Sequence, residues 1–175
     1  MIRVAHTSEL EPALLEDTRQ MLVEVFEGDF EDHDWEHALG GMHALAYEDG
    51  ELVGHASVVQ RRLLHGSRAL RAGYVEGVGV RQAARRRGHG SALMEAVERV
   101  IRRAYEVGAL GTTDEAIPLY ASHGWLPWRG ETFALTPAGR VRTPDDDGAV
   151  CVLEVSAPLD RPGELACDWR DGGVW

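Results

Sequence analysis

The chain has 175 residues, of which 44% are hydrophobic, a proportion that argues against a disordered chain. Asp and Glu number 29 against 18 basic residues, all of them Arg, so the formal net charge is −11. Such a charge disfavours nucleic acid and anionic membranes as partners. It would attract a cationic small molecule, although solubility alone also explains it.

In chain order, the sequence predicts a strand at 2–6, a helix at 8–26, strands at 42–48, 52–60 and 69–80, a helix at 91–107, a strand at 108–112, a helix at 115–123, and strands near 131–135 and 149–155. Ser8 and Glu11 have the spacing of a capping box at the start of the first helix. This mixture predicts an α/β or α+β fold in a single domain, 1–175, with residues 156–175 as a C-terminal tail laid over it.

Targeting signals and disulfides are not expected. The sequence contains no run of 18 apolar residues, and the charged residues after MIRVAH leave no room for the apolar core of a signal peptide. Two cysteines, Cys151 and Cys167, cannot build a disulfide framework. We therefore expect a cytoplasmic protein.

The loop RRRGHG, residues 85–90, lies between a predicted strand and a predicted helix and fits the pattern Arg-x-x-Gly-x-Gly. A helix N-terminus offers unpaired N–H groups, glycines allow a phosphate to approach the backbone, and Arg adds bidentate contacts. The loop therefore predicts a diphosphate site formed by Arg85, Arg86, Arg87, Gly88, His89 and Gly90. A simple turn with a solvated basic face is the alternative, and the pattern is neither a Walker loop nor a dinucleotide fingerprint.

The strand before this loop, GYVEGVGVR, contains Gly73, Gly77 and Gly79. Glycine inside a strand often marks a bulge or the close approach of another chain. A splayed strand of this kind exposes N–H and C=O groups that can pair with an amide-containing cofactor arm. Strand, loop and helix together resemble the acyl-CoA site of the GCN5-related N-acetyltransferases.

A closer resemblance covers about Thr18 to Trp175 and is carried by DWEHALGGMHAL, QRRL, GYVEGVGVR, LYASHGWLPWRG, RTPDDDG and the terminal CDWRDGGVW. These segments are similar to the aminoglycoside 2′-N-acetyltransferases. The resemblance implies direct transfer of an acetyl group from acetyl-CoA to the 2′-amine of an aminoglycoside, without a metal. It also implies a mixed, mostly antiparallel sheet that is splayed at the acetyl-CoA site with helices on both faces, and a homodimer.

The resemblance also implies roles for individual residues. The main chain of Val78, Gly79 and Val80 would meet the acetyl carbonyl and the pantetheine arm. Glu76 would accept the proton of the attacking amine, and Tyr120 would donate a proton to the leaving thiolate. The alternatives are an outward-facing strand residue for Glu76 and a half-buried helix aromatic for Tyr120.

For the cationic acceptor, the resemblance implies an acidic and polar binding surface contributed by Asp29, Asp34, Glu76, Gly77, Gly111, Thr112, Asp146 and the terminal carboxylate of Trp175. Trp169 and Trp175 indicate an anchored tail rather than the frayed end usual for termini. The sequence departs from the family at Gly173, where relatives have Asp, and at Gly111-Thr112, which replaces a serine-rich turn. Both departures concern the range of acceptors more than the reaction.

Other interpretations stay open at this point. The acceptor could be another polyamine or amino sugar, or the protein could bind acyl-CoA or aminoglycoside without turnover. His33 and His37 have the spacing of two metal ligands on one helix face, but the sequence offers no third ligand at a motif spacing.

Overall fold

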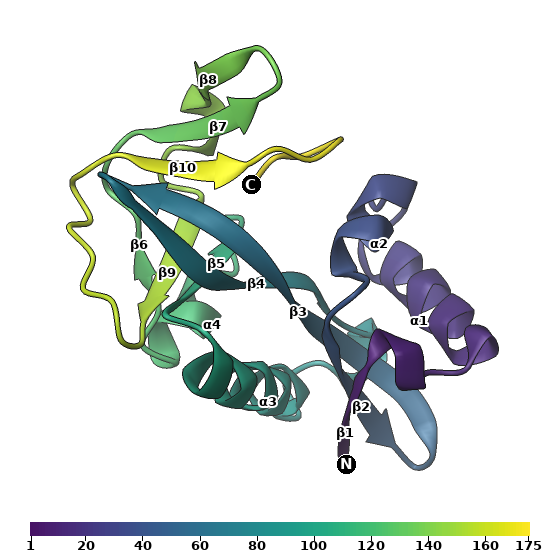
Figure 1. Cartoon of the computed structure of the whole chain (residues 1–175). Coiled ribbons are helices and arrows are strands. Elements are labelled where there is room, and N and C mark those ends of the chain that lie inside the picture. Colours follow the sequence, from purple (N-terminus) through teal and green to yellow (C-terminus); the bar gives the residue numbers. More distant parts are fainter. The chain divides into compact units, whose positions relative to one another are not determined.

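The computed structural model describes residues 1–175, and the chain forms two compact units (Figure 1). The first unit comprises residues 1–59 and 75–100, and the second comprises 60–74 and 101–175. Three long elements contribute residues to both units: β3 (Glu51–His65), β4 (Arg68–Val80) and α3 (His89–Ala104).

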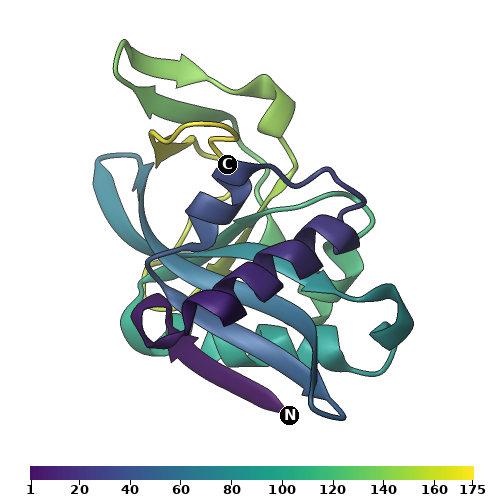
Figure 2. The same ribbon diagram turned by 90° about the vertical axis from the view of Figure 1, so that its right-hand side faces the viewer.

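The first unit begins with β1 (Ile2–His6), a 3₁₀ turn η1 (Thr7–Glu9), α1 (Pro12–Val25), α2 (Asp32–Ala38) and β2 (Met42–Glu48), and also holds the 3₁₀ turn η2 (Gln82–Ala84). β2 pairs antiparallel with both β1 and β3. Asp49 and Gly50, with φ of 51° and 88°, form the tight turn between β2 and β3 that the Asp-Gly pair predicts. α1 crosses these strands (Figure 2) and buries Thr18, Met21 and Leu22.

The second unit contains β5 (Val107–Gly111), α4 (Ile117–Ser122), β6 (Leu126–Pro127), β7 (Thr132–Thr136), β8 (Gly139–Arg142), the 3₁₀ turn η3 (Pro144–Asp146), β9 (Val150–Glu154) and β10 (Leu165–Asp168). The strand order is β6-β9-β5-β4-β3-β10-β7-β8. β4 pairs parallel with β5, as β10 does with β7, whereas β9, β6 and β8 pair antiparallel with their partners. The mixed sheet with helices that the sequence predicts is confirmed.

The core of the second unit is built around two tryptophans, Trp125 and Trp128, which are 1% exposed. A Cβ at Gly108 would lie 2.8 Å from the Trp125 ring, so β5 accepts the indole only because that position lacks a side chain. Aromatic residues of this size bury 150–250 Å² each. They stabilise the unit chiefly by removing apolar surface from water.

The start of α1 was predicted incorrectly. Ser8 and Glu11 do not form a capping box; instead His6 and Glu9 cap the 3₁₀ turn η1, and α1 begins at Pro12. Pro12 is suited to a first helical turn because its fixed φ is helical and its missing N–H would have had no intrahelical partner there.

Further boundaries also differ from the sequence prediction, and β3 extends to His65, beyond the predicted end at residue 60. α3 begins at His89 and ends at Ala104, two to three residues before the predicted limits of 91–107. The last twenty residues are not only a tail, because β10 lies within the sheet between β3 and β7. None of the helices combines the length and the apolar character required to cross a membrane.

Candidate functional site

The end of β4 in the first unit is distorted at Gly77, whose φ of 56° lies in the left-handed region. Only glycine adopts this region readily, so this distortion at Gly77, referred to below as the β4 bulge, depends on that residue. Gly79 serves a different purpose: a Cβ there would lie 3.0 Å from side-chain atoms of Leu22 and Val25, so α1 packs directly against the backbone. The two glycines lie in the last part of β4, which also carries Glu76, Val78 and Val80.

The arginine-rich loop leads into α3. Arg86 and Gly88 both have positive φ, at 62° and 85°, and the helix begins at His89. The first intrahelical bond recorded there runs from the Ala92 N–H to the Gly88 carbonyl, at 3.0 Å. The N–H groups of the residues between them therefore lie at the helix N-terminus, where the helix dipole favours an anion.

The side chains of the loop arginines are exposed, and most contact other parts of the first unit. Arg85 donates to the carbonyl oxygens of Val80 at 3.0 Å and Val25 at 3.5 Å. Arg87 pairs with Glu48 at 2.9 Å. Exposed pairs of this type contribute little stability, so the guanidinium groups can exchange these partners for a phosphate at small cost.

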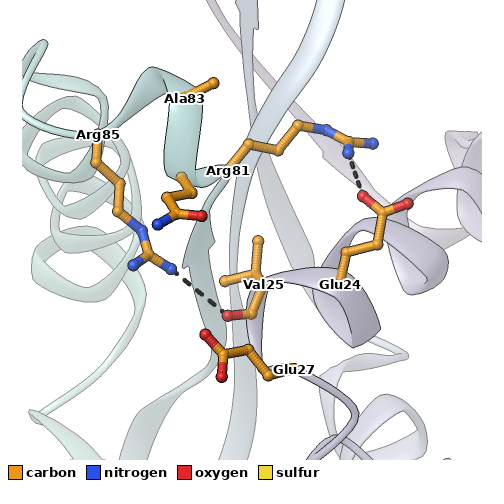
Figure 3. Close-up of a pocket in the computed structure, with 7 residues that line it drawn as sticks. Glu24, Val25, Glu27, Arg81, Ala83 and Arg85 are labelled. Atoms are coloured by element: carbon orange, nitrogen blue, oxygen red, sulfur yellow. Dashed lines mark hydrogen bonds and ion pairs between the residues drawn. The ribbon is translucent and has the colours of Figure 1, made fainter.

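A hollow of about 370 Å³ lies beside this loop and is lined by Glu24, Val25, Glu27, Arg81, Gln82, Ala83 and Arg85 (Figure 3). In it, Arg81 pairs with Glu24 and also donates to the Leu52 carbonyl at 3.1 Å. The hollow thus combines two guanidinium groups with two carboxylates. The α3 N-terminus and its exposed arginines fit an anionic diphosphate better than this mixed hollow does.

The predicted acidic residues of the first unit differ in what they contact. Asp29 is exposed after the end of α1. Asp34 accepts a hydrogen bond from the Glu31 N–H at 2.8 Å, which caps α2, and lies 3.3 Å from Nε2 of His33. Oδ2 of Asp34 is therefore used by the helix cap, and Oδ1 faces the His33 ring, so both oxygens already have neighbours in the fold.

Tyr120 lies in the second unit on α4 and is 6% exposed. Burial raises the pKa of Tyr120 to about 12, the nearby Cys151 thiol adds to this shift, and a hydrogen bond with Thr112 opposes it. The phenol is consequently neutral at any physiological pH. It carries the hydrogen that a proton donor needs.

The tail belongs to the second unit, and the C-terminus lies beside β10 (Figure 1). The Trp175 indole donates to the Thr143 hydroxyl at 3.0 Å, and the Cys167 thiol donates to the Val174 carbonyl at 3.3 Å. A Cβ at Gly111 would lie 3.3 Å from the terminal carboxyl carbon, so the end of β5 is adjacent to this carboxylate. The structure therefore brings Gly111 and Trp175 together. Trp169, by contrast, is 47% exposed and does not anchor the tail by burial.

The same threonine also links the tail to the acidic turn η3. Partial burial raises the pKa of Asp146, and its hydrogen bond with Thr143 opposes the shift. Asp147 instead pairs with Arg142 and accepts from Thr132, so it is part of the fold. Thr143 contacts both Asp146 and Trp175, yet nothing in its sequence context distinguishes it from other threonines.

The structure contains no group of three or more His, Cys, Asp or Glu able to hold a metal ion. The rings of His33 and His37 are 5.6 Å apart, and His33 lies beside Glu31 and Asp34. Cys151 and Cys167 are both free and buried.

Residues 9–125 match the family described as the acetyltransferase (GNAT) family. The chain therefore belongs to this family. Within it, the chain is similar to the aminoglycoside 2′-N-acetyltransferase of Mycolicibacterium fortuitum, with 54% identity over 177 residues that cover 99% of this chain and 91% of that relative. The resemblance to this group that the sequence indicated is thus confirmed.

Two solved structures from Escherichia coli share the fold. ElaA superposes with a TM-score of 0.62 at 19% identity, covering 88% of this chain and 99% of its own. The GNAT family N-acetyltransferase YhbS, solved in complex with CoA, gives a TM-score of 0.67 at 17% identity and covers 95% of this chain and 88% of its own.

Proposed function

We propose that this protein transfers the acetyl group of acetyl-CoA to the 2′-amine of aminoglycosides. The observation that carries the proposal is the 54% identity to the Mycolicibacterium fortuitum aminoglycoside 2′-N-acetyltransferase over 99% of the chain. The acyl acceptor is polycationic, which suits a protein with a formal net charge of −11.

In this proposal, acetyl-CoA binds through its diphosphate at the N-terminus of α3, with Arg85, Arg86, Arg87, Gly88, His89 and Gly90 around it. The main chain of Val78, Gly79 and Val80 pairs with the pantetheine arm and the acetyl carbonyl. The positive φ of Gly77 supports this assignment, because a bulge turns strand N–H and C=O groups away from their regular partners.

The acceptor side consists of Asp29, Asp34, Glu76, Gly77, Gly111, Thr112, Asp146 and the terminal carboxylate of Trp175. Carboxylates bind the ammonium groups of an aminoglycoside and exclude neutral competitors. The anchored tail supports the role of the Trp175 carboxylate, since a fixed anion loses less entropy on binding than a mobile one.

The chemical step is attack of the neutral 2′-amine on the thioester carbonyl, which forms a C–N bond and breaks the C–S bond. Glu76, directly or through a water molecule, accepts the proton that the amine loses, and CoA leaves as a thiolate. Tyr120 donates a hydrogen bond or its proton to that sulfur. Because an ordinary thiol titrates near 8.5, a phenol with a pKa of about 12 shares its proton with the sulfur rather than releasing it outright.

We further propose a cytoplasmic homodimer formed from a single acetyltransferase domain, in which residues 156–175 complete the acceptor site. Acetylation converts an ammonium into a neutral amide and so removes one cation from the drug. Expression in a susceptible host should therefore confer aminoglycoside resistance.

The test is to mix the purified protein with acetyl-CoA and a panel of aminoglycosides with and without a 2′-amine, and to follow free thiol. Turnover confined to compounds with a 2′-amine supports the proposal. Turnover only with unrelated amines or amino sugars contradicts it in favour of another acceptor. Tight binding without release of thiol contradicts it in favour of a non-catalytic module.

A further inference from the structure

A continuous chain of hydrogen bonds runs through the interior of the first unit and ends at the β4 bulge. Nε2 of His43 lies 2.8 Å from the Thr7 hydroxyl, and Nδ1 of His43 lies 2.9 Å from Nε2 of His55. Nδ1 of His55 then lies 2.7 Å from the carbonyl oxygen of Gly77. Both histidines are 0% exposed.

When both rings are neutral, the partners in this hydrogen-bond chain determine which nitrogen of each ring carries the hydrogen. A carbonyl oxygen only accepts, so Nδ1 of His55 carries a hydrogen and donates it to Gly77. The neutral ring then accepts at Nε2 from Nδ1–H of His43, which leaves Nε2 of His43 as the acceptor for the Thr7 hydroxyl. Thr7 in turn accepts from the Gly40 N–H at 2.9 Å. All polar atoms are satisfied when both rings are neutral.

The neutral state agrees with the surroundings of the two rings. Burial lowers the pKa of His43 to about 4, and the nearby His6 of β1 lowers it further. Burial, together with His43, lowers the pKa of His55 to about 3, while the bond to Gly77 opposes the shift. The chain of donors and acceptors is therefore constant across the physiological pH range.

The bulge is held at two successive carbonyls from the same face of β3. Ser57, two residues after His55, donates to the carbonyl oxygen of Glu76 at 3.3 Å. Atoms of His55 and Leu22 each lie 3.3 Å from a Cβ built at Gly77, so both side chains pack closely against the backbone at this residue. The segment that carries Glu76 is thus fastened by side chains that do not themselves reach solvent.

The same pair of rings is linked to α2. The indole of Trp35 lies 6.2 Å from the ring of His43 and 6.2 Å from that of His55. Trp35 follows Asp34, whose carboxylate caps the helix. The histidine pair is therefore in contact with the two segments of the first unit that carry Glu76 and Asp34.

We propose that His55, oriented by His43 and Thr7, is a positioning residue for acetyl transfer, which holds the Gly77 bulge and thereby the backbone of Glu76 in the geometry needed for proton acceptance. The inference rests on the proposed function for its catalytic consequence. A buried chain of hydrogen bonds could stabilise the unit from any end point. This one ends on the carbonyl oxygen of Gly77, the residue directly after Glu76.

Four variants test the proposal. His55→Leu removes both hydrogen bonds of the ring, and His55→Asn retains an N–H donor at the position of Nδ1 but loses the bond to His43. Thr7→Val leaves both rings and removes the donor at the start of the chain. The matched control is His65→Leu, because His65 also lies on β3 and its Nδ1 is 2.9 Å from a carbonyl oxygen, that of Glu164.

With acetyl-CoA and an aminoglycoside bearing a 2′-amine, His55→Leu should lower kcat by about 10²-fold, the scale expected for misplacing a reacting group. The KM for acetyl-CoA should stay within about twofold, because the α3 N-terminus is untouched. His55→Asn should recover most of the rate, and Thr7→Val should lie between the two. Equal losses in His55→Leu and His65→Leu, or no recovery in a folded His55→Asn protein, would overturn the proposal.

A second measurement does not depend on turnover. Nitrogen-15 NMR of the wild-type protein at pH 7 should show a hydrogen on Nδ1 of both histidines, and His55→Asn should shift the backbone amides of Glu76, Gly77 and Val78 where His65→Leu does not. A hydrogen on Nε2 of His55, or unmoved amides in His55→Asn, would overturn the positioning role. If the wild-type protein acetylates no aminoglycoside while these NMR results hold, the proposed function fails and the structural assignment of the bulge stands.

Discussion

The two units of this protein use charge in different ways. In the first unit, the guanidinium groups of the Arg85–Arg87 loop are exposed and share weak contacts with carbonyl oxygens and Glu48. In the second unit, the groups assigned to the acceptor and the leaving thiol are buried or anchored, with Tyr120 bonded to Thr112 and Trp175 bonded to Thr143. The comparison shows an exposed basic rim, Arg85–Arg87, in the first unit, and buried or hydrogen-bonded Tyr120 and Trp175 in the second.

The largest expected effect concerns the buried phenol of the second unit. Replacing Tyr120 with Phe removes the donor for the leaving sulfur and should lower kcat by at least about 10²-fold, with little change in either KM. Steady-state release of free thiol measures the effect, with Tyr47→Phe in the first unit as the control. A Tyr120→Phe enzyme with wild-type kcat would show that the second unit supplies no proton donor.

The next effect concerns the buried histidines of the first unit. Since the pKa values of His43 and His55 are lowered to about 4 and 3 in the folded protein, the unfolded chain binds more protons between pH 6.5 and 4. The pair therefore contributes stability that is fully present above pH 6.5 and is lost as the pH falls through this range. The free energy of unfolding should therefore fall by about 2 kcal/mol per pH unit between pH 6 and 5.

Urea unfolding at pH 7, 6 and 5 measures this loss. His55→Asn removes one of the two titrating rings, so it should reduce the pH dependence attributed to the pair by about half. The same dependence in wild type and variant would mean that His55 is not held neutral by the fold.

A smaller effect is expected from the tail of the second unit. Deleting Trp175 removes the indole that bonds to Thr143 and moves the terminal carboxylate away from Gly111. The KM for aminoglycoside should rise by about tenfold, the scale of one charged hydrogen bond, while the KM for acetyl-CoA stays unchanged. Thr143→Val keeps the carboxylate but removes the bond, and should give part of the same increase. Parallel losses for both substrates would instead indicate a folding defect.

The smallest effects should come from the basic rim of the first unit. Replacing Arg85, Arg86 or Arg87 singly with Ala should raise the KM for acetyl-CoA by about threefold each and should weaken its salt dependence, because exposed charges are screened. Arg99→Ala, an exposed arginine further along α3, is the control and should change nothing. If the KM for acetyl-CoA of these three variants equals that of Arg99→Ala, the diphosphate is bound by the backbone N–H groups of the α3 N-terminus without the arginine side chains.

Prediction from sequence succeeded where the structural signal is local in the chain. The strand, loop and helix around residues 85–90 are confirmed, because their residues are contiguous, and so is the turn at 48–51, which Asp-Gly favours. The diphosphate site in that loop stays a prediction. Prediction failed at Ser8, since the choice between two helix starts depended on Pro12 and on a carboxylate at Glu9. The tail was only partly understood because β10 is stabilised by β3 and β7, which are remote in sequence.

Sequence patterns alone predicted the order of most strands and helices, the loop between β4 and α3, and a resemblance that the 54% identical relative confirms. Which polar residues contact one another depends on tertiary structure. His43 and His55 are brought together by the register of β2 and β3, which places His43 opposite Ser57 and His55 diagonal to it on the same face. Likewise, Trp175 donates a hydrogen bond to Thr143, which is 32 residues earlier in the sequence, and only the folded tail brings the two together. The periodicity of a sequence describes the faces of one helix or strand. Contacts such as these depend instead on the register between two elements.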